Sequence, residues 1–429
     1  MSAAPDWARD PRLDGLEVYC VGGAVRDALL GLVPSEHDFV VVGADPETLA
    51  ARGFRAVGRD FPVFLHPETS AEFALARTER KTAPGYGGFT FHTGSEVTLS
   101  DDLRRRDLTV NAIAQARDGT LHDPFGGRAD LARKRLRHVS PAFVEDPLRV
   151  LRLARFATRF AEFTIDEETL ALCRELVASG EVDHLVPERV WQELARALMH
   201  DRPSRFFEVL RTTGALARLL PELDALWGVP QVAEYHPEID TGVHTLLVID
   251  EAAAMDTSLA VRFACLVHDL GKALTPAEQL PRHIGHEARG IRPVEQVSER
   301  LKVPRAVREL ALLVCRHHLR CHRVREMRAD TVVRFLGELD AFRRPQRFEE
   351  FVQACAADKR GRLGASGRDY PAGDWLRRAF QAAATVDAAS LDETPAAGAE
   401  FGRALARARA ARVAALEHET VSGGSDAAR

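Results

Sequence analysis

Cysteine is scarce in this chain of 429 residues, and the cysteines present form no recognisable pattern. The six cysteines stand singly, mostly inside apolar or helical runs, and none belongs to a CxxC pair. Such spacing argues against a secreted disulfide framework. We therefore expect reduced thiols and a cytoplasmic protein.

Long apolar runs are also missing. No stretch approaches the roughly 18 uninterrupted apolar residues that a membrane span requires. The first ten residues, MSAAPDWARD, contain no hydrophobic signal core. We expect a soluble protein that is not exported and has no membrane partner.

A strong net charge is absent too, because 58 basic and 63 acidic side chains leave a formal charge of −5. A global positive field is thereby excluded, so that local basic patches must hold any nucleic-acid partner. The 45% hydrophobic and 28% charged residues are ordinary for a folded chain. The length suits two to four domains.

The pattern along the chain changes once, near Pro141. Before it, short β-rich runs alternate with Gly, Pro and Asp turns, which predicts an α/β domain over residues 16–139. After it, helical periodicity predicts an all-α remainder: a helical region at 140–228, a histidine-rich region at 229–362 and a helical tail at 363–429 with a disordered end. The first helices of this remainder are expected at 146–160, 166–178, 187–200 and 203–213.

A diglycine turn and two acids mark the start of the first domain. An apolar run predicts a strand that ends at Val21, and Gly22 and Gly23 then let the backbone approach a phosphate at the next helix. Glu36 and Asp38 precede a buried-strand pattern, where residues two apart project from one face. The two carboxylates therefore converge on one point, as a divalent cation requires.

Glu72 and Arg106 are candidates for the same site. Glu72 lies on another predicted strand and could add a third carboxylate to a two-metal site, with a surface glutamate as the equal alternative. Arg106 is expected to contact a triphosphate or RNA, because guanidinium forks match phosphate geometry. The neighbouring Arg104 and Arg105 remain open to a salt-bridged helix start.

The segment EDPLRVLRLARF, residues 145–156, predicts a helix with a basic stripe. The stripe consists of Arg149, Arg152, Arg155 and Arg159. Asp146 and Arg149 are neighbours at positions i and i+3. An acceptor beside a donor suits cytosine or adenine, since both carry an exocyclic amino group next to a ring-nitrogen acceptor. An intrahelical salt bridge on a solvated face is the ordinary alternative.

Histidines and aspartates gather in the second half, around the adjacent pair His268 and Asp269. The residues expected to bind one divalent ion are His244, His268, Asp269 and Asp358, and those for a second ion are His286 and His318. Such side chains from several helices can activate a water for phosphate-ester hydrolysis. His283 and His317 belong to the same group of candidates. For any one histidine a core or surface position is the alternative, and this interpretation is kept for His322.

From Val18 to about Arg378 the chain resembles the bacterial CCA-adding enzymes, class II tRNA nucleotidyltransferases of the polymerase beta superfamily. The pieces that carry the resemblance are GGAVRDALLG, GRDFPVFLHP, ALARTERK, DDLRRRDLTVNA, RHVSPAF, EDPLRVLR, HPEIDTGVHT and HDLGK. The resemblance is closest to the multifunctional form with an HD phosphohydrolase domain. It implies a polymerase-beta-like α/β head followed by an all-α neck, body and HD-domain tail.

The resemblance implies an enzyme that adds C, C and A to tRNA 3′ ends without a nucleic-acid template. CTP and ATP are the implied substrates, and pyrophosphate is released. The residues that it assigns to the nucleotide are Gly23, Arg26, Arg106, Arg152 and Arg155, with Asp146 and Arg149 templating the base. It assigns magnesium to Glu36 and Asp38. For the HD domain it implies 2′,3′-cyclic phosphodiesterase, 2′-nucleotidase and phosphatase activities, the last supported by nickel.

Alternatives remain open at this stage. One is a poly(A) polymerase, or an enzyme that adds only CC or only A. Another is a phosphohydrolase whose head binds nucleotide or RNA without catalysis, and a third is a regulatory RNA-binding protein. Monomer and homodimer are equally compatible with the sequence. The segment at 81–95, rich in Gly and Thr, is a candidate moving element.

Glu36 departs from the family pattern, which usually reads Asp-x-Asp at this strand. Magnesium demands near-ideal octahedral geometry at about 2.0 to 2.1 Å, and glutamate is one methylene longer. We expect Glu36 to bind metal with weakened affinity or with a preference shifted toward manganese. Glu36→Asp should therefore leave nucleotide incorporation equal or higher, and a large loss would show that the longer side chain is required.

Overall fold

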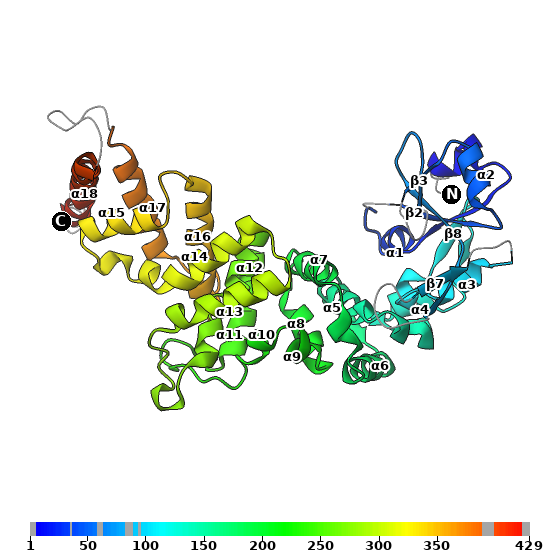
Figure 1. Cartoon of the computed structure of the whole chain (residues 1–429), viewed down its shortest axis with the longest axis horizontal. Coiled ribbons are helices and arrows are strands. Elements are labelled where there is room, and N and C mark those ends of the chain that lie inside the picture. Colours follow the sequence, from blue (N-terminus) through cyan, green and yellow to red (C-terminus); the bar gives the residue numbers. More distant parts are fainter. Residues whose placement is uncertain are drawn as a thin grey trace, which may run out of the picture. The chain divides into compact units, whose positions relative to one another are not determined.

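The computed structural model describes residues 6–34, 37–57, 63–81, 89–92, 96–387 and 399–422. Its contacts divide the chain into two compact units (Figure 1). The first unit comprises Met1–Leu194 and Arg205–Leu219, and the second comprises Ala195–Ser204 and Leu220–Arg429. Most of the candidate moving segment at 81–95, and the chain end after 422, lie outside the described residues.

The first unit contains a seven-stranded sheet in the order β3-β4-β5-β2-β1-β8-β9. Its strands are β1 (Glu17–Val21), β2 (Asp38–Val42), β3 (Arg55–Val57), β4 (Val63–Leu65), β5 (Glu72–Leu75), β8 (Ala114–Ala116) and β9 (Leu121–His122). All neighbouring strands are antiparallel except β2 and β5, which run parallel. The parallel pair places the first residues of β2 and β5 at the same edge of the sheet.

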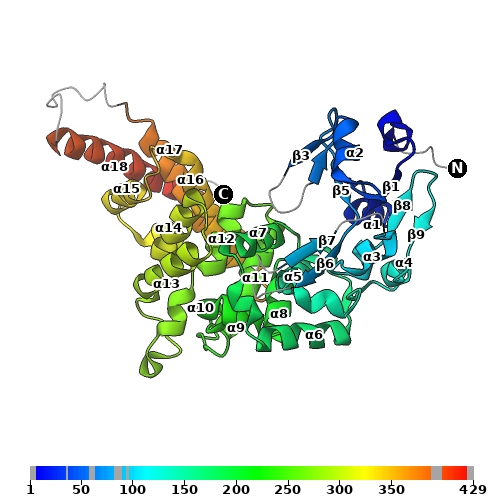
Figure 2. The ribbon, with the colours of Figure 1, turned by 45° about the vertical axis from the view of Figure 1, so that its right-hand side comes forward.

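Two smaller pairings complete the strands of this unit. An antiparallel hairpin joins β6 (Thr78–Lys81) to β7 (Phe89–His92), as Figure 2 shows. A parallel pair joins β10 (Arg135–Leu136) to β11 (Thr164–Ile165).

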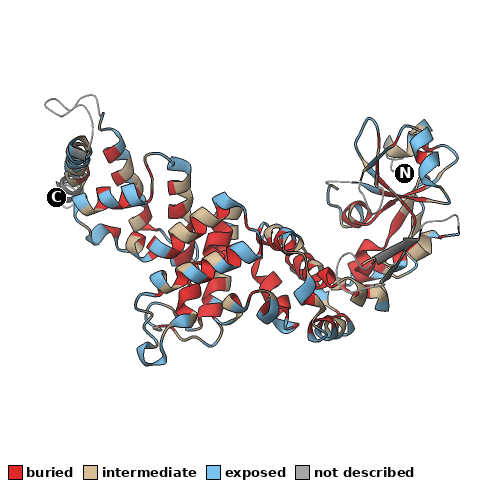
Figure 3. Ribbon diagram, viewed as in Figure 1, coloured by how far each residue is buried: buried red, intermediate tan, exposed pale blue. Residues whose placement is uncertain are grey.

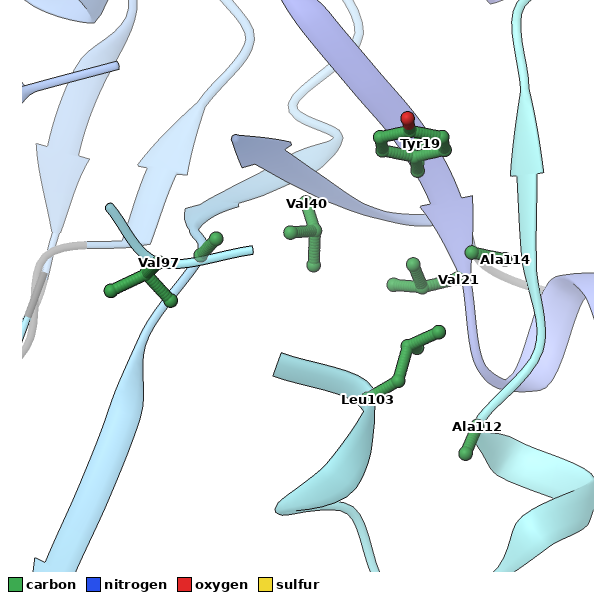
Figure 4. Close-up of a cluster of buried hydrophobic side chains, with 8 residues drawn as sticks. Tyr19, Val21, Val40, Val97, Leu103, Ala112 and Ala114 are labelled. Carbon is green, nitrogen blue, oxygen red and sulfur yellow. The ribbon is translucent and has the colours of Figure 1, made fainter. Parts of the chain in front are cut away.

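A compact apolar cluster lies beneath the central strands. Tyr19 and Val21 share one face of β1 because they are two residues apart, and Tyr19 lies opposite Val40 of β2. Figure 4 shows Val21 and Val40 facing Leu103, which comes from helix α3 (Leu99–Arg104). Val97 extends the same cluster. These contacts bury one face of the sheet and fix the strands that carry the first candidate site.

Helices surround this sheet and continue beyond it. They are α1 (Gly23–Leu29), α2 (Pro46–Ala51), α3 (Leu99–Arg104), α4 (Gly127–Ala132), α5 (Leu148–Arg159), α6 (Glu167–Ala178), α7 (Pro187–Leu198), α8 (Ser204–Thr212) and α9 (Ala215–Leu219). The ends of α5 to α8 lie within two residues of the bounds expected from the sequence. The predicted order, an α/β domain followed by an almost entirely helical remainder, is confirmed.

The second unit is helical throughout its described residues. Its α-helices are α10 (Pro221–Asp224), α11 (Thr241–Ala254), α12 (Leu259–Val267), α13 (His286–Arg300), α14 (Arg305–His322), α15 (Ala329–Glu338), α16 (Pro345–Arg360), α17 (Pro371–Ala384) and α18 (Ala399–Ser422). The apolar sequence LAVRFACLV makes α12 the central helix, packed against α11, α14 and α16, and Figure 3 shows it largely buried. Within the described parts of the chain, no helix combines the length and apolar character that crossing a membrane requires.

Two glycines of the second unit provide a matched test of this packing. A Cβ on Gly361 would lie 2.5 Å from the Val248 Cα of α11, whereas a Cβ on Gly337 would meet nothing within 4 Å. We expect Gly361→Ala to destabilise the unit by about 1 to 3 kcal/mol through overpacking. Gly337→Ala, inside α15, should stabilise it by about 0.5 to 1 kcal/mol through helix propensity. Thermal melting checks both, and equal shifts would contradict the packing described for α11 and α16.

Candidate active sites

The first candidate site lies at the edge of the sheet where β2 and β5 begin. Asp38 and Glu72 are the first residues of these strands and pair directly in the parallel register. Because register partners on parallel strands project to the same face, both carboxylates point to one side of the sheet. Both residues are exposed. Glu36, the other expected metal ligand, lies outside the described residues.

The diglycine turn leads from β1 into α1 and is flanked by two arginines. Gly22 has φ +70° and ψ −123°, a conformation that is strained for any residue with a Cβ. A Cβ there would lie 3.0 Å from Arg106 Nη1, and one on Gly23 would lie 3.6 Å from Arg26 Nη2. The Gly22 amide donates to Ile113 O at 3.2 Å. Because this backbone hydrogen bond occupies the amide, it is not available to a phosphate.

Arg106 is the better placed of the two arginines to meet an anion. Its Nη2 donates to Asp102 Oδ2 at 3.1 Å, which anchors one side of the guanidinium. Its Nε is buried and has no hydrogen-bond partner. A cation beside a glycine backbone, with a donor still unsatisfied, fits a phosphate group.

Arg26 is buried rather than open to the turn. Its guanidinium bonds to Asp27 Oδ1 at 2.9 Å and to the Asn111 side chain, and it lies 5.2 Å and 5.1 Å from the ring centroids of Phe156 and Phe160. Burial lowers the pKa of Arg26, while the Asp27 carboxylate opposes that shift. Arg26 therefore ties α1 to α5, which carries Phe156 and is capped by Phe160.

Three arginines of the α5 stripe form ion pairs with carboxylates from other elements. Arg152 Nη2 lies 2.7 Å from Asp107 Oδ2, and Arg155 pairs with Glu193 of α7. Burial acts to raise the pKa of Asp107, but Arg152 holds it well below its ordinary range. Arg159 extends the pairing with a 2.7 Å contact to Asp27 of α1. These bonds hold α1 and α7 against α5.

Asp146 and Arg149, the expected base-reading pair, lie at the start of α5 with separate partners. Asp146 Oδ1 accepts from the Leu148 amide at 3.0 Å, and its Oδ2 lies 3.3 Å from Arg189 Nη2 of α7. Arg149 is buried and donates to Ala142 O at 2.6 Å as well as to the Arg105 carbonyl. Two backbone carbonyls thus fix the guanidinium of Arg149, whereas the Leu148 amide and the Arg189 side chain hold the carboxylate of Asp146.

The second candidate site is a buried cluster at the centre of the helical unit. The members are His244 of α11, His268 and Asp269 after α12, His286 of α13, His318 of α14 and Asp358 of α16. Three triads of these residues have ligand atoms within 4.8 Å of one another: His244 with His268 and Asp269, His268 with His318 and Asp358, and Asp269 with His286 and His318. The structure therefore brings together the six residues that the sequence assigned to the two ions of the histidine-rich region.

The four histidines present the same ring nitrogen to the centre of this cluster. In His268, His286 and His318, Nδ1 lies 2.7, 2.7 and 3.1 Å from a backbone carbonyl. His244 Nδ1 lies 2.9 Å from the carboxylate of Glu238. A proton on Nδ1 leaves the Nε2 lone pair free, which is the arrangement of metal-binding histidines.

Unsatisfied acceptors confirm that the cluster suits a cation. Asp269 Oδ2 lies 3.1 Å from His268 Nε2 and its Oδ1 lies 3.2 Å from His286 Nε2, yet neither oxygen has a partner in hydrogen-bond geometry. Burial acts to raise the pKa of Asp269, but His268 and Lys272 hold it well below its ordinary range. Burial lowers the pKa of His318 to about 3, which keeps that ring neutral. Neutral imidazoles and ionised carboxylates are the forms that bind divalent metals.

The remaining histidines divide differently from the sequence interpretation. His283 bonds to Thr275 and the Pro230 carbonyl, and His317 packs against the Phe335 ring, so neither joins the triads. His322, interpreted as an ordinary histidine, has both ring nitrogens satisfied, with Nε2 2.6 Å from Asp358 Oδ2 and Nδ1 2.8 Å from the Tyr370 hydroxyl. Among the described residues it belongs to none of the triads.

Several polar residues at these sites were not proposed from the sequence. In the first unit these are Asp107, Asn111, Glu193 and Arg189, and in the second they are His236, Glu238, Gln231 and Lys272. Lys272 stands in the HDLGK motif, and its Nζ lies 2.6 Å from both Asp269 Oδ2 and Gln231 Oε1. His236 and Glu238 stand in HPEIDTGVHT. These charged residues stand within motifs that carry the family resemblance, and that position was the signal that could have identified them as site residues.

A cavity of about 910 Å³ opens beside the histidine cluster. His286, His322 and Lys272 reach it from the cluster. The other basic side chains in its wall are Arg282, Arg320, Arg323, Lys359 and Arg362. Basic groups outnumber acidic ones in the wall, which suits a phosphorylated ligand.

Three family models match this chain. The Poly A polymerase head domain matches residues 18–137, the probable RNA and SrmB-binding site of polymerase A matches 162–226, and the HD domain matches 241–344. The histidine cluster lies mostly in the last of these ranges, and the diglycine turn lies in the first.

Curated proteins and solved structures resemble the chain over most of its length. It is 61% identical over 396 residues to the multifunctional CCA protein of Ralstonia nicotianae, covering 91% of this chain and 92% of that protein. It is 59% identical over 415 residues to the multifunctional CCA protein of Halorhodospira halophila, covering 96% and 100%. The crystal structure of the Bacillus stearothermophilus CCA-adding enzyme in complex with CTP shares the fold, with a TM-score of 0.62, 24% identity and coverage of 94% and 91%.

Proposed function

The chain belongs to the family of multifunctional CCA proteins, and from this premise we propose that it adds C, C and A to the 3′ ends of tRNA. CTP and ATP are the substrates, and pyrophosphate is the leaving group. A tRNA substrate places the enzyme in the cytoplasm. The observation that carries the proposal is the pairing of Asp38 with Glu72 at one sheet edge, in the same domain as the Gly22 turn and Arg106.

The proposed activities are assigned to successive segments of the chain. We assign residues 16–139 to the nucleotidyltransferase head, 140–228 to a neck and body that bind the base and the tRNA, 229–362 to the HD phosphohydrolase domain and 363–429 to a helical tail. The matched ranges of the family models support the first three assignments.

In the head, the terminal hydroxyl of the tRNA attacks the α-phosphate of the bound nucleotide. Asp38, together with Glu36 and Glu72, would hold magnesium, which when bound supplies activation of the hydroxyl and charge neutralisation at the leaving oxygens. Arg106 neutralises charge on the phosphates with its guanidinium, which Asp102 anchors on one side. Gly22 keeps a side chain out of the space beside that guanidinium.

Base selection is assigned to Asp146 and Arg149. Arg149 is fixed by two backbone carbonyls, so that its guanidinium has a defined orientation. Asp146 shares its carboxylate with the Leu148 amide and Arg189, and the amino group of cytosine or adenine would join or replace Arg189. Arg152 and Arg155 are neutralised by buried carboxylates, which suits a role in holding the nucleotide pocket in shape.

The HD domain is assigned a metal-dependent hydrolysis of phosphate esters. His244, His268, Asp269 and Asp358 would hold one divalent ion, and His286 and His318 a second, with nickel as the family's ion for phosphatase activity. A bound ion supplies an activated water and polarises the phosphate. Lys272 is buried beside Asp269 and reaches the cavity, where its ammonium group can bind a phosphate oxygen. The substrates are 2′,3′-cyclic phosphates, 2′-nucleotides and phosphate monoesters.

The transferase activity has a direct test. The full-length protein is incubated with tRNA that lacks its terminal CCA, with labelled CTP and ATP and with magnesium or manganese, and the added nucleotides are sequenced. We expect CCA alone. Asp38→Asn should lower the rate by about 100-fold or more, since several kcal/mol of charge stabilisation is lost.

Asp118→Asn serves as the control, because Asp118 is exposed and only closes a turn onto the Thr120 amide. A homopolymeric A tail would instead indicate a poly(A) polymerase, and addition of CC or A alone would indicate the partial enzymes. No incorporation with either ion would overturn the proposal.

The hydrolase activity is tested by His268→Ala. Hydrolysis of a 2′,3′-cyclic nucleotide with nickel should fall by about 100-fold or more, because a ligand shared by two of the triads is removed. CCA addition should persist. His317→Gln is the matched control, since His317 neighbours His318 on α14 but packs against Phe335. Unchanged hydrolysis in His268→Ala would show the HD assignment to be wrong.

A further inference from the structure

His244 differs from the other histidines of the cluster in the partner of its Nδ1 atom. His268, His286 and His318 each place Nδ1 against a backbone carbonyl. His244 places it 2.9 Å from the carboxylate oxygen Oε1 of Glu238. A backbone carbonyl cannot be altered by substitution, whereas a carboxylate can, so this contact is open to direct test.

The side chain of Glu238 is buried, although the residue as a whole is half-buried, and both of its oxygens make contacts. Its side chain is 2% exposed. Oε1 also lies 3.1 Å from His236 Nδ1, and Oε2 accepts the Leu363 amide at 3.2 Å. Two imidazoles therefore converge on one oxygen, and the segment after α16 holds the other oxygen.

The loop that carries Glu238 is itself well anchored. Ile239 has φ +61°, an unusual value for a β-branched residue, and its carbonyl accepts the Gln231 amide at 2.7 Å. Asp240 then caps α11 by accepting the Val243 amide at 2.9 Å. Because His244 stands in the first turn of α11, the same cap fixes the distance between Glu238 and His244.

A third metal ion among His236, Glu238 and His244 is the competing interpretation, since their ligand atoms lie within 4.8 Å of one another. The other contacts of Glu238 favour an anchoring role. His236 Nδ1 meets Oε1 in hydrogen-bond geometry at 3.1 Å, and Oε2 accepts the Leu363 amide. His244 Nδ1 lies 2.9 Å from Oε1 but outside hydrogen-bond geometry, so the carboxylate acts on this ring through its charge at short range.

We propose that Glu238 is a positioning residue that holds His244 in the Nδ1-protonated tautomer and thereby presents Nε2 to the metal site. His244 Nε2 lies 3.2 Å from Asp358 Oδ1 on that side. A carboxylate partner also strengthens the Nε2 lone pair more than a neutral carbonyl does. The inference rests on the proposed hydrolase site and concerns how that site is built.

The first experiment measures nickel binding by the full-length protein in an Asp38→Asn background, which weakens the metal site proposed for the head. Calorimetry gives the affinity, and elemental analysis gives the number of bound ions. We expect Glu238→Ala to weaken nickel binding by about 10-fold to 100-fold with the number of ions unchanged. Glu238→Gln, which keeps an acceptor oxygen, should recover part of that loss. Glu278→Gln, an exposed residue of the same unit, should bind as the parent does.

The second experiment reads the tautomer of His244 without metal, by ¹⁵N NMR of histidine-labelled protein. The parent and Glu238→Gln should show Nδ1 protonated, and Glu238→Ala should show a shift toward the Nε2 tautomer. A merely structural role for Glu238 would leave the tautomer unchanged in all three proteins, which overturns the inference.

The outcomes separate this inference from the proposed function. Loss of one whole ion in Glu238→Ala, with the remaining affinity unchanged, would identify a third metal site and overturn the positioning role. Absence of nickel binding in the parent would contradict the hydrolase proposal, while the tautomer measurement would still decide the role of Glu238.

Discussion

Both candidate sites depend on how the fold compensates buried charge. An ionised side chain removed from water costs several kcal/mol unless an opposite charge and hydrogen bonds accompany it. Arg26 and Asp107 are buried in the first unit, and Asp269 and Asp358 in the second. The partners of these four residues therefore set the positions of the helices that carry them, and with them the geometry of each site.

The two units meet this constraint in different ways. In the first, Asp107 and Glu193 pair with Arg152 and Arg155 of α5, so that each of these buried charges has a partner within the protein. In the second, His268 and Lys272 approach Asp269, but its oxygens remain without hydrogen-bond geometry. Charges that are paired within the protein stabilise the packing of its helices, whereas converging unsatisfied acceptors are suited to a cation.

Much of the architecture could be predicted because it depends on local patterns. The helices α5 to α8 follow apolar periodicity, and the change from strands to helices near Pro141 follows the end of the alternating runs. The residue types at the metal cluster were also readable, since His268 and Asp269 stand together after an apolar helix. The partners Asp107, Glu193 and Glu238 were not readable, because a carboxylate that binds a distant arginine or histidine has the same local pattern as a solvated one.

The sequence by itself determined the order of the domains, the family and the segments that supply polar side chains to each site, because motifs and periodicity act over short stretches of chain. Only the tertiary structure decided which of those side chains meet. The parallel pairing of β2 with β5 sets Asp38 beside Glu72, and the packing of α11, α14 and α16 around α12 brings His244, His318 and Asp358 to one point. The reason is physical: contacts between residues 34 to 114 positions apart depend on how whole strands and helices bury their apolar faces.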